Sequence, residues 1–296
     1  MQKLFDNIKG DRLIWAIAAL LAIFSFLPVY SAASNLAYTK GVTTFSLFFK
    51  HFMHLSLGFS IMYAVHRVSY RYFRGISMIM LPVVLLLLLV TMFQGNTIAG
   101  ANASRWIQIP IVGMSFQTST FASVVLMVYV ARYLSKIKDK TITFKESILP
   151  LWVPVFLVLM LILPANFSTT AIIFSMVMML AFIGGYPVKY LALIIGAGII
   201  GLTMFILVAK AFPGAMPNRV DTWMSRIENF SNGVDTEEDY QIEQAKIAIA
   251  SGGIKGVGPG KSVQKNFLPQ SSSDFIFAII IEEYGLIGGM VVLVAY

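Results

Sequence analysis

Long apolar runs separated by short polar segments dominate the chain. Residues 76–93, for example, carry no charge over almost a full bilayer crossing, which takes about 20 helical residues. This pattern predicts an all-α, polytopic membrane protein built as a multi-span helical bundle. We predict eight membrane spans, at residues 13–33, 50–66, 75–94, 115–134, 148–164, 168–184, 187–210 and 274–296.

The composition supports this interpretation. Of the 296 residues, 57% are hydrophobic and only 12% are charged, which is more apolar surface than a soluble domain of this size needs. Cysteine is absent, so a disulfide framework and a thiol nucleophile are excluded. A net charge of +8 would suit nucleic acid, but the spans favour a charge asymmetry across a membrane, and no nucleic-acid partner is expected.

The basic residues predict the orientation of the helices. With a cytoplasmic N-terminus, the internal loops collect most of the Lys and Arg residues, as the positive-inside rule predicts. The run that follows Lys3, Lys9 and Arg12 resembles a signal peptide, but the many later spans indicate a retained first helix. The other internal basic residues are Arg67, Arg71, Arg74, Arg132, Lys136, Lys138, Lys140, Lys145 and Lys189.

Residues 213–273 form a long extracytoplasmic loop on this topology. Two short amphipathic helices are predicted within it, Arg219–Phe230 and Tyr240–Ala250, the second ended by Gly252–Gly253. The first outward-facing carboxylate is Asp221, so external acid–base chemistry must use this loop or the helix after it. The last apolar run reaches Tyr296 without a polar anchor, and further C-terminal spans are expected.

Three carboxylates around the last span are candidates for chemistry. Asp274 follows a serine cluster at the start of the span and is either a helix cap or a general base. Glu282 and Glu283 lie inside the apolar run, where charge is costly. They either pair with basic side chains or line a cavity. Adjacent helix positions diverge by about 100°, so the two are not expected to point the same way.

Two segments are candidates for binding an anion. The glycine-rich loop from Gly252 to Ser262 lacks the Walker spacing, and no nucleotide is expected there. It is either a plain turn or a pyrophosphate cradle made by backbone N–H groups with Lys255, Lys261 and Lys265. Arg105, beside the interfacial Trp106, suits a phosphate. His51 and His54 lack a third metal ligand and are expected to pack at the interface.

Three stretches resemble the SEDS family (shape, elongation, division and sporulation). Residues 256–285 match the family pattern GxGxGxSxQKxFLPxxxxDFIFAxxxEExG almost letter for letter. A second family pattern is R-x-x-x-F, then Y-Q before a double glycine. It is matched by Arg226, Phe230, Tyr240, Gln241 and Gly252–Gly253. Residues 100–106 and 117–120 fit, more loosely, G-A-x-R-W and Q-P-S-E. The acidic position of the latter is Thr120, a lysine position is Ser123, and a further acidic position is Asn166. The division type is matched more closely than the elongation type.

The resemblance implies a function and a set of roles. The family polymerises peptidoglycan from lipid II in the bacterial cytoplasmic membrane with a GT-C-like fold of about ten spans, of which about eight are present in a single domain, 1–296. Asp274 is then the catalytic base. Arg105, Lys261, Ser262, Gln264 and Lys265 are expected to bind substrate pyrophosphate, with Gln117, Ser119, Glu282 and Glu283 lining the cavity.

The family further implies a divalent cation (Mg²⁺ or Mn²⁺), a class B penicillin-binding protein transpeptidase as partner, and other division proteins. Two alternatives stay open. One is a flippase for the lipid-linked precursor, since Gly and Pro breaks and polar residues at the midplane suit transporters. The other is a catalytically lapsed scaffold that recruits a transpeptidase, because Thr120, Ser123 and Asn166 depart from the family pattern.

Overall fold

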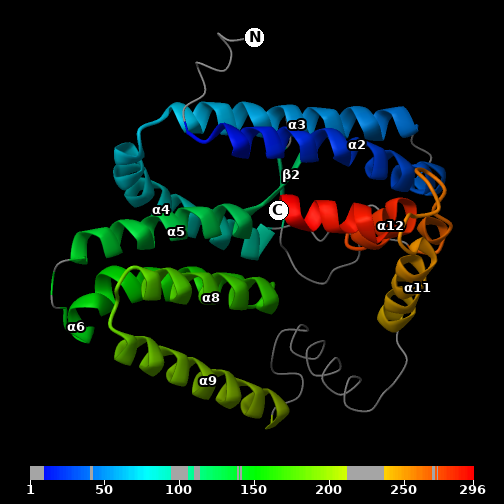
Figure 1. Ribbon diagram of the computed structural model, residues 1–296. Coiled ribbons are helices and arrows are strands. Elements are labelled where there is room, and N and C mark those ends of the chain that lie inside the picture. Colours follow the sequence, from blue (N-terminus) through cyan, green and yellow to red (C-terminus); the bar gives the residue numbers. More distant parts are fainter. Residues whose placement is uncertain are drawn as a thin grey trace. The chain divides into compact units, whose positions relative to one another are not determined.

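The computed structural model describes residues 10–40, 43–94, 106–109, 114–138, 140, 142–211, 237–268, 271 and 273–296. Contacts divide the chain into two units (Figure 1). Unit 1 combines Met1–Val68 with Asn232–Tyr296, and unit 2 is Ser69–Ser231. Each unit is described below by itself.

Unit 1 joins the first two long helices to the last. Helices α2 and α3 run side by side, with Phe26 packed on Phe48 and His51 at ring-centroid distances of 5.1 and 5.2 Å. His51 Nε2 lies 2.9 Å from Ser25 Oγ, so this histidine packs between α2 and α3. The unit contains α2 (Arg12–Lys40), α3 (Thr44–Arg67), α11 (Glu237–Gly252), the 3₁₀ turn η2 (Gln264–Asn266) and α12 (Ile276–Ala295).

Unit 2 is a bundle with a small hairpin. Its core is formed by aliphatic side chains of α4, α5, α7 and α8, among them the fully buried Val84, Leu126, Val155 and Val177. Exposed apolar side chains cover its outer surface, as lipid-facing helices require. The elements are α4 (Tyr70–Gln94), β1 (Trp106–Ile109), β2 (Met114–Gln117), α5 (Thr118–Ile137), α6 (Phe144–Ser147), the π turn η1 (Ile148–Trp152), α7 (Val153–Ile162), α8 (Phe167–Ile183) and α9 (Val188–Ala211).

The helical pattern of the predicted spans is confirmed. Five described helices are long and apolar enough to cross a membrane: Arg12–Ala32, Tyr70–Phe93, Thr118–Ile137, Phe144–Ile162 and Ile276–Ala295. Phe167–Ile183 and Val188–Met204 are shorter apolar helices. Helix α3, the predicted span at 50–66, carries Lys50 and three histidines and is not among them. Within the large loop, α11 contains the predicted helix Tyr240–Ala250, whereas Arg219–Phe230 lies outside the described residues.

The predicted start of the fourth span, at residue 115, is wrong. Residues 114–117 form β2, which pairs antiparallel with β1 so that Trp106 faces Gln117, and α5 begins only at Thr118. Residues 114–117 adopt a strand rather than a first helical turn because their backbone groups pair across the hairpin. The first N–H groups of a helix have no such backbone partners. Thr91 Oγ1 then donates to Thr118 Oγ1 (3.0 Å), a buried bond that joins α4 to the first turn of α5.

Two prolines shape the next span. Helix bonding widens into a π turn at Ile148–Trp152, where the Val153 N–H bonds to the Ile148 carbonyl. Pro154 has no N–H to donate to the carbonyl of Pro150, four residues earlier. The hydroxyl of Tyr129, on α5, donates to that carbonyl instead, at 2.6 Å. A side chain thus repairs the gap that proline leaves in an apolar helix.

Candidate functional site

Helix α12 is broken at Gly285. This residue has φ +72° and ψ −177°, which lies outside the helical region, so the helices on either side of it are separate. The peptide groups freed by the break bond to the glycine-rich loop rather than to one another. Four bonds do this: Val257 N–H to Glu282 O (2.9 Å), Gly258 N–H to Glu283 O (3.0 Å), Leu286 N–H to Gly253 O (2.9 Å) and Ile287 N–H to Ile254 O (3.4 Å).

Glycines make this close backbone contact possible. A Cβ on Gly285 would collide with the carbonyl oxygen of Ile254, and a Cβ on Gly256 would collide with the carbonyl oxygen of Glu283. The backbone nitrogen of each of these glycines lies 2.6 Å from the Cβ position of the other. Gly256 also has φ +79°, a conformation that L side chains rarely adopt. The two positions therefore require each other to lack a side chain.

The break also bends α12 sharply. A Cβ built on Gly289 would lie 3.5 Å from Cζ of Phe277, twelve residues earlier. In a straight helix residues 277 and 289 would lie about 18 Å apart along the helix axis. The predicted span at 274–296 is present as Ile276–Ala295, but it is interrupted at Gly285, which the sequence did not predict. Backbone partners from the loop outweigh the helical bonds that α12 would otherwise make across Gly285.

Glu282 is buried at the break, with 2% of its surface exposed, and its carboxylate faces only donors. Oε1 accepts the N–H groups of Val263 (3.0 Å) and Gln264 (3.3 Å), at the start of η2. Oε2 accepts the hydroxyl of Ser262. An ionised carboxylate suits such a ring of donors, because each N–H and O–H points at negative charge. Glu282 thus fastens the end of the loop to α12.

Glu283, with 1% exposed, fastens the same loop to α2. Its Oε1 accepts the Ser31 hydroxyl and the Ser262 N–H (3.4 Å). Lys265 Nζ also donates to Ser31 Oγ (3.3 Å) and to the Gly260 carbonyl (2.8 Å). The two glutamates have different main partners, η2 for Glu282 and α2 for Glu283, but they share one residue. Both bond to Ser262, one to its hydroxyl and one to its N–H, because the loop wraps around the broken end of the helix.

These contacts change the interpretation of the glycine-rich loop. It was a candidate cradle in which backbone N–H groups hold a pyrophosphate. Seven described N–H groups of the loop and of the turn after it bond to acceptors inside the protein instead. The Gly256 and Lys261 N–H groups donate to carbonyls within the loop, those of Gly252 and Gly258. The Val257 and Gly258 N–H groups donate to carbonyls of α12. The N–H groups of Ser262, Val263 and Gln264 donate to the two carboxylates. The turn at η2 is an anion site, and the protein's own Glu282 fills it.

Helix α11 packs on α12 through small side chains. Ala245 and Ala248 form a buried cluster with Ala278. Gly252, one turn further on, is buried, and a Cβ there would collide with the Ile281 carbonyl. Small residues spaced at three and four positions let two helix backbones approach closely. This stripe sets where α11 ends and therefore where the loop meets the break.

Asp274 lies in the turn before α12 and is exposed. The N-cap residue of α12 is Phe275, and no side chain caps this helix end. Asp274 forms no hydrogen bond or ion pair with the residues that the structure describes. The capping role that the sequence left open is therefore not taken up. Of the three carboxylates in this segment, Asp274 is the one without an intramolecular task.

The remaining predicted site residues are divided between the two units. Lys261, with an exposed side chain, belongs to unit 1 together with Asp274 and the buried cluster. Gln117 and Ser119 belong to unit 2, at the start of α5, where Ser119 is buried and Gln117 accepts the Thr120 hydroxyl at 3.2 Å. Arg105 lies outside the described residues.

All three departures from the family pattern make local hydrogen bonds, and that of Thr120 to Gln117 is given above. Asn166 caps α8, with its Oδ1 accepting the Thr169 N–H at 3.1 Å. The Ser123 hydroxyl donates to the Thr120 carbonyl, one turn back, at 2.7 Å. Both are contacts that an uncharged side chain makes without an external partner.

Sequence reasoning missed two residues of the cluster. Ser31, the partner of Glu283, lies 252 positions away and gave no signal of its own in the first span. Gly285 directly follows Glu282, Glu283 and Tyr284 in an apolar run, and glycine inside a helical pattern can mark a break. A glycine at this position was the available signal for the bend.

No metal cluster is apparent in the described part of the chain, which holds no group of three His, Cys, Asp or Glu side chains. The Glu282 and Glu283 pair does not fit a cation either. Three of their four carboxylate oxygens already accept N–H or O–H donors, which compete with a metal for the same lone pairs.

The fold and the site define a class of protein. The chain is an all-α, multi-pass membrane protein whose last described span is broken and clamped by a glycine-rich loop. A family model described as "Cell cycle protein", FtsW/RodA/SpoVE, matches residues 11–296. The chain therefore belongs to this family of bacterial multi-pass membrane proteins.

Individual relatives agree with this assignment. The chain is 30% identical to a "Probable peptidoglycan glycosyltransferase FtsW" of Marinomonas mediterranea, over 99% of this chain and 71% of that protein. It is 32% identical to a protein of the same name from Geobacter sulfurreducens, over 96% and 74%.

Two solved structures share the fold. One comes from work on "structural coordination of polymerization and crosslinking by a peptidoglycan synthase complex", with TM-score 0.66, 20% identity and coverage of 98% of this chain and 75% of that one. The other is a mutant of the rod shape determining protein RodA of Thermus thermophilus, with TM-score 0.61, 19% identity and coverage of 98% and 72%.

Proposed function

We propose that this chain is a peptidoglycan glycosyltransferase of the FtsW type, which polymerises lipid II at the outer face of the bacterial cytoplasmic membrane during cell division. The observation that carries the proposal is the near full-length similarity to relatives with that name. The placement of Asp274 supports it further. Its carboxylate is exposed and free of described partners at the start of a span.

In this reaction Asp274 is the general base. It takes the proton from the acceptor's sugar hydroxyl while that oxygen attacks the anomeric carbon of the donor. The bond from this carbon to the pyrophosphate oxygen breaks, and undecaprenyl pyrophosphate leaves with the electron pair. General-base assistance of this kind is typically worth about 10²–10⁴-fold in rate. A carboxylate that caps no helix and pairs with no described cation is suited to receive a proton.

The buried cluster supports this chemistry by positioning. Glu282 and Glu283 hold the loop through Ser262 and through the backbone, so these residues anchor the site. The groups proposed for the leaving pyrophosphate are the side chains of Lys261, Lys265 and Arg105, whose positive charges stabilise the departing phosphate oxygens, and the amide of Gln264, which donates a hydrogen bond. Lys261 and Lys255 are exposed.

The proposal includes a divalent cation, Mg²⁺ or Mn²⁺, that would be bound by the pyrophosphate of the substrate. In many enzymes such cations are bound largely through substrate phosphates. When bound, the cation neutralises charge on the leaving group. Chelation with EDTA should then lower the rate, and adding Mg²⁺ or Mn²⁺ back should restore it.

Partner and orientation are part of the same proposal. A neighbour in fold comes from work on a peptidoglycan synthase complex, which supports a membrane partner that crosslinks the product, here a class B penicillin-binding protein, with other division proteins around them. The bias of Lys and Arg places the N-terminus in the cytoplasm and Asp274 outside.

The test is polymerisation of labelled lipid II by purified protein in detergent, with and without the transpeptidase. Asp274→Asn should lower the rate by at least about 100-fold while the protein stays monodisperse. Glu243→Gln, an exposed carboxylate on α11, is the matched control and should leave the rate within about twofold. A normal rate in Asp274→Asn would overturn the assignment of the base.

The same assay separates the rival functions. A broken span is also typical of transporters, so the bend in α12 fits a flippase as well. A flippase only moves lipid across a bilayer, and a scaffold only recruits a partner. Neither makes polymer in detergent. Polymer formation by the chain without its partner would support the enzyme over both.

A further inference from the structure

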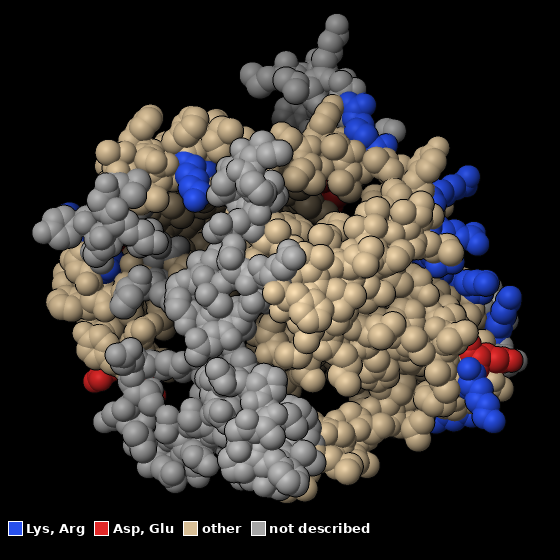
Figure 2. Space-filling model, turned by 180° about the vertical axis from the view of Figure 1, so that it is seen from behind, with Lys and Arg blue, Asp and Glu red and all other residues tan. Residues whose placement is uncertain are grey.

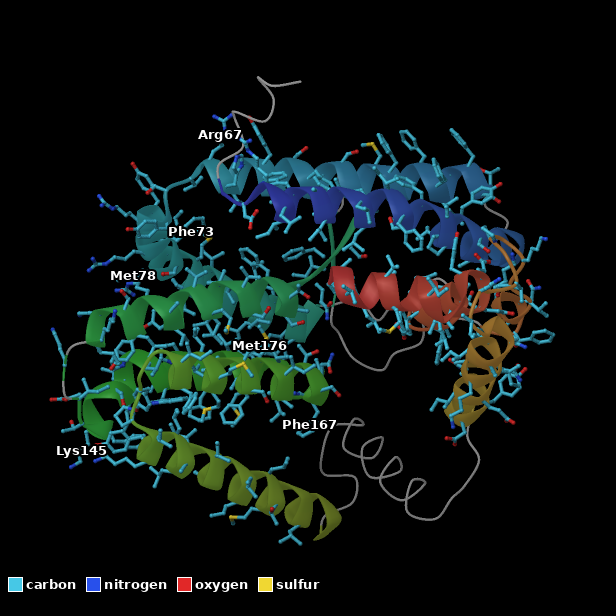
Figure 3. The ribbon with its side chains drawn as sticks, in the orientation of Figure 1. Arg67, Phe73, Met78, Lys145, Phe167 and Met176 are labelled. Atoms are coloured by element: carbon cyan, nitrogen blue, oxygen red, sulfur yellow. The ribbon has the colours of Figure 1, made fainter. Side chains whose placement is uncertain are left out.

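A cavity of about 860 Å³ lies at one end of unit 2. It is formed where α4 begins, α5 ends and the α6–η1 segment begins. Figure 3 shows Phe73, a lining residue on α4, and Lys145, on α6, at this end, while Phe167, at the start of α8, lies at the opposite end of unit 2.

The cavity is strongly basic. Five cations line it against one described carboxylate, Glu146; the cations are Arg71, Arg74, Arg132, Lys136 and Lys140. Figure 2 shows Lys and Arg side chains gathered along this edge, where the ends of α4, α5 and α6 lie. Glu146 is a single negative charge against five positive ones, and its Oε2 accepts the Thr143 N–H (2.9 Å) in a capping box at the start of α6. Converging like charges in a hollow favour a bound anion.

The cavity is also partly apolar and built into the fold. Arg132 is half-buried, with its guanidinium 5.7 Å from the centre of the Tyr129 ring. That ring is itself fixed by the bond from its hydroxyl to Pro150 O. The rings of Tyr70, Phe73 and Tyr133 line the cavity beside the cations. This lining differs from a row of solvated lysines, because it combines a planar cation with apolar walls.

The depth of the cavity selects the kind of anion. Tyr70–Phe93, Thr118–Ile137 and Phe144–Ile162 are candidate membrane spans, and the cavity is lined by the first residues of one, the last of the second and the first of the third. It therefore lies at the level of lipid headgroups. Ile76 and Leu149, which flank the lining along the helices, are 43% and 75% exposed and offer apolar surface to acyl chains.

We propose that this cavity binds the phosphate headgroup of an anionic phospholipid from the leaflet at the basic end of unit 2. The headgroup phosphate contacts Arg74 and Arg132 from two helices, and the acyl chains lie along the exposed apolar residues of α4 and η1. Basic pockets between the ends of spans bind such headgroups in membrane proteins, on the side that the Lys and Arg bias predicts to be cytoplasmic here. The proposal is independent of the glycosyl transfer.

The test compares lipid binding by the purified full chain in nanodiscs of phosphatidylcholine with and without phosphatidylglycerol. Native mass spectrometry counts the retained lipids. Arg74→Gln with Arg132→Gln should weaken phosphatidylglycerol binding by about 10- to 30-fold, since each cation near a headgroup contributes measurably. Lys145→Gln with Lys189→Gln is the matched control. It removes two charges outside the cavity lining and should leave retention within about twofold.

The other outcomes are equally specific. Equal losses in the two double variants would overturn the proposal and leave a general surface-charge effect. Displacement of the lipid by millimolar inorganic phosphate would show that a soluble phosphate is the ligand. Binding of an acidic peptide in preference to phosphatidylglycerol would show a protein partner instead. If the arginine variant does not stay monodisperse, Lys136→Gln with Lys140→Gln, both at exposed positions, replaces it.

Discussion

The two units of the protein place polar groups inside apolar helices in different ways. In unit 2 the buried polar groups are neutral, and one set of them forms a network around Tyr186. Tyr186, 2% exposed, shares its hydroxyl with Ser147 (2.5 Å) and accepts the indole N–H of Trp152 (3.0 Å). In unit 1 the buried groups are two carboxylates at a broken helix, and they bond to a loop that lies 18–21 residues earlier in the chain.

This difference separates a scaffold from a site. A neutral network leaves no charge to compensate in a low-dielectric surrounding, so it stabilises the bundle at modest cost. The arrangement in unit 1 needs more partners, and Glu283 Oε2 still lacks one within the described residues. Buried groups that are satisfied only through a loop are costly to keep, and such costs are concentrated at functional sites. We therefore expect substitutions in unit 1 to have the larger effects.

The largest effect is expected for Gly285→Ala. The new Cβ would meet the Ile254 carbonyl, and the residue would have to keep φ +72° with ψ −177°. Alanine cannot do both, and the loss should be at least about 3 kcal/mol in the free energy of unfolding. Fluorescence-detected size exclusion after heating in detergent measures it.

Gly198→Ala is the matched control. Gly198 lies within α9, and a Cβ there meets nothing within 4 Å. Alanine should be neutral or stabilise by up to about 1 kcal/mol. If both variants behaved alike, the close packing of α12 on the loop would be contradicted.

An intermediate effect is expected for Glu282→Gln. The amide keeps one acceptor but turns an NH₂ group toward the donors of Ser262, Val263 and Gln264. Leaving buried donors unmatched should cost about 1–3 kcal/mol and loosen the loop. The thermal midpoint and proteolysis between residues 253 and 268 measure the two consequences. Glu243→Gln, with no described partner, should change neither, and unchanged proteolysis in Glu282→Gln would argue against the clamp.

The smallest effect is expected in unit 2, for Tyr186→Phe. The ring stays in the core, but Ser147 and the Trp152 indole lose a shared partner. Because both lost bonds are neutral, the cost should be about 1–2 kcal/mol in the thermal unfolding of the detergent-solubilised chain. Tyr190→Phe removes a hydroxyl that bonds to no described group and should have almost no effect. A loss in Tyr186→Phe larger than in Glu282→Gln would reverse the comparison.

The helices were predictable because their signal is local. Long uncharged runs such as 76–93 have few alternatives to a membrane helix, and the structure bears them out. Asp274 and the glutamates could be named as candidates because charge near or inside an apolar run is costly. The break at Gly285 was not found, because its hydrogen-bond partners lie some thirty residues earlier, in a loop whose conformation sequence patterns do not give.

The same limit applied to pairing and register. Ser31 and Glu283 meet across 252 positions, a distance over which a single sequence carries no pairing information. The β1–β2 hairpin was missed because its four-residue strands lie next to a strongly apolar helix and share its composition. The π turn depends on Tyr129, from another helix, to satisfy Pro150. Each of these features is decided by a partner outside the window that predicts it.

The bend at Gly285 has a consequence for biosynthesis. Ribosomes deliver residues 253–258 before residues 282–287, so the four complementary peptide groups exist when the last described helix enters the bilayer. A reordered gene that delivered this helix first would expose two carbonyls and two amides to hydrocarbon, at several kcal/mol for each group. Because the loop precedes the helix in the chain, its hydrogen-bond partners are already synthesised when the helix inserts.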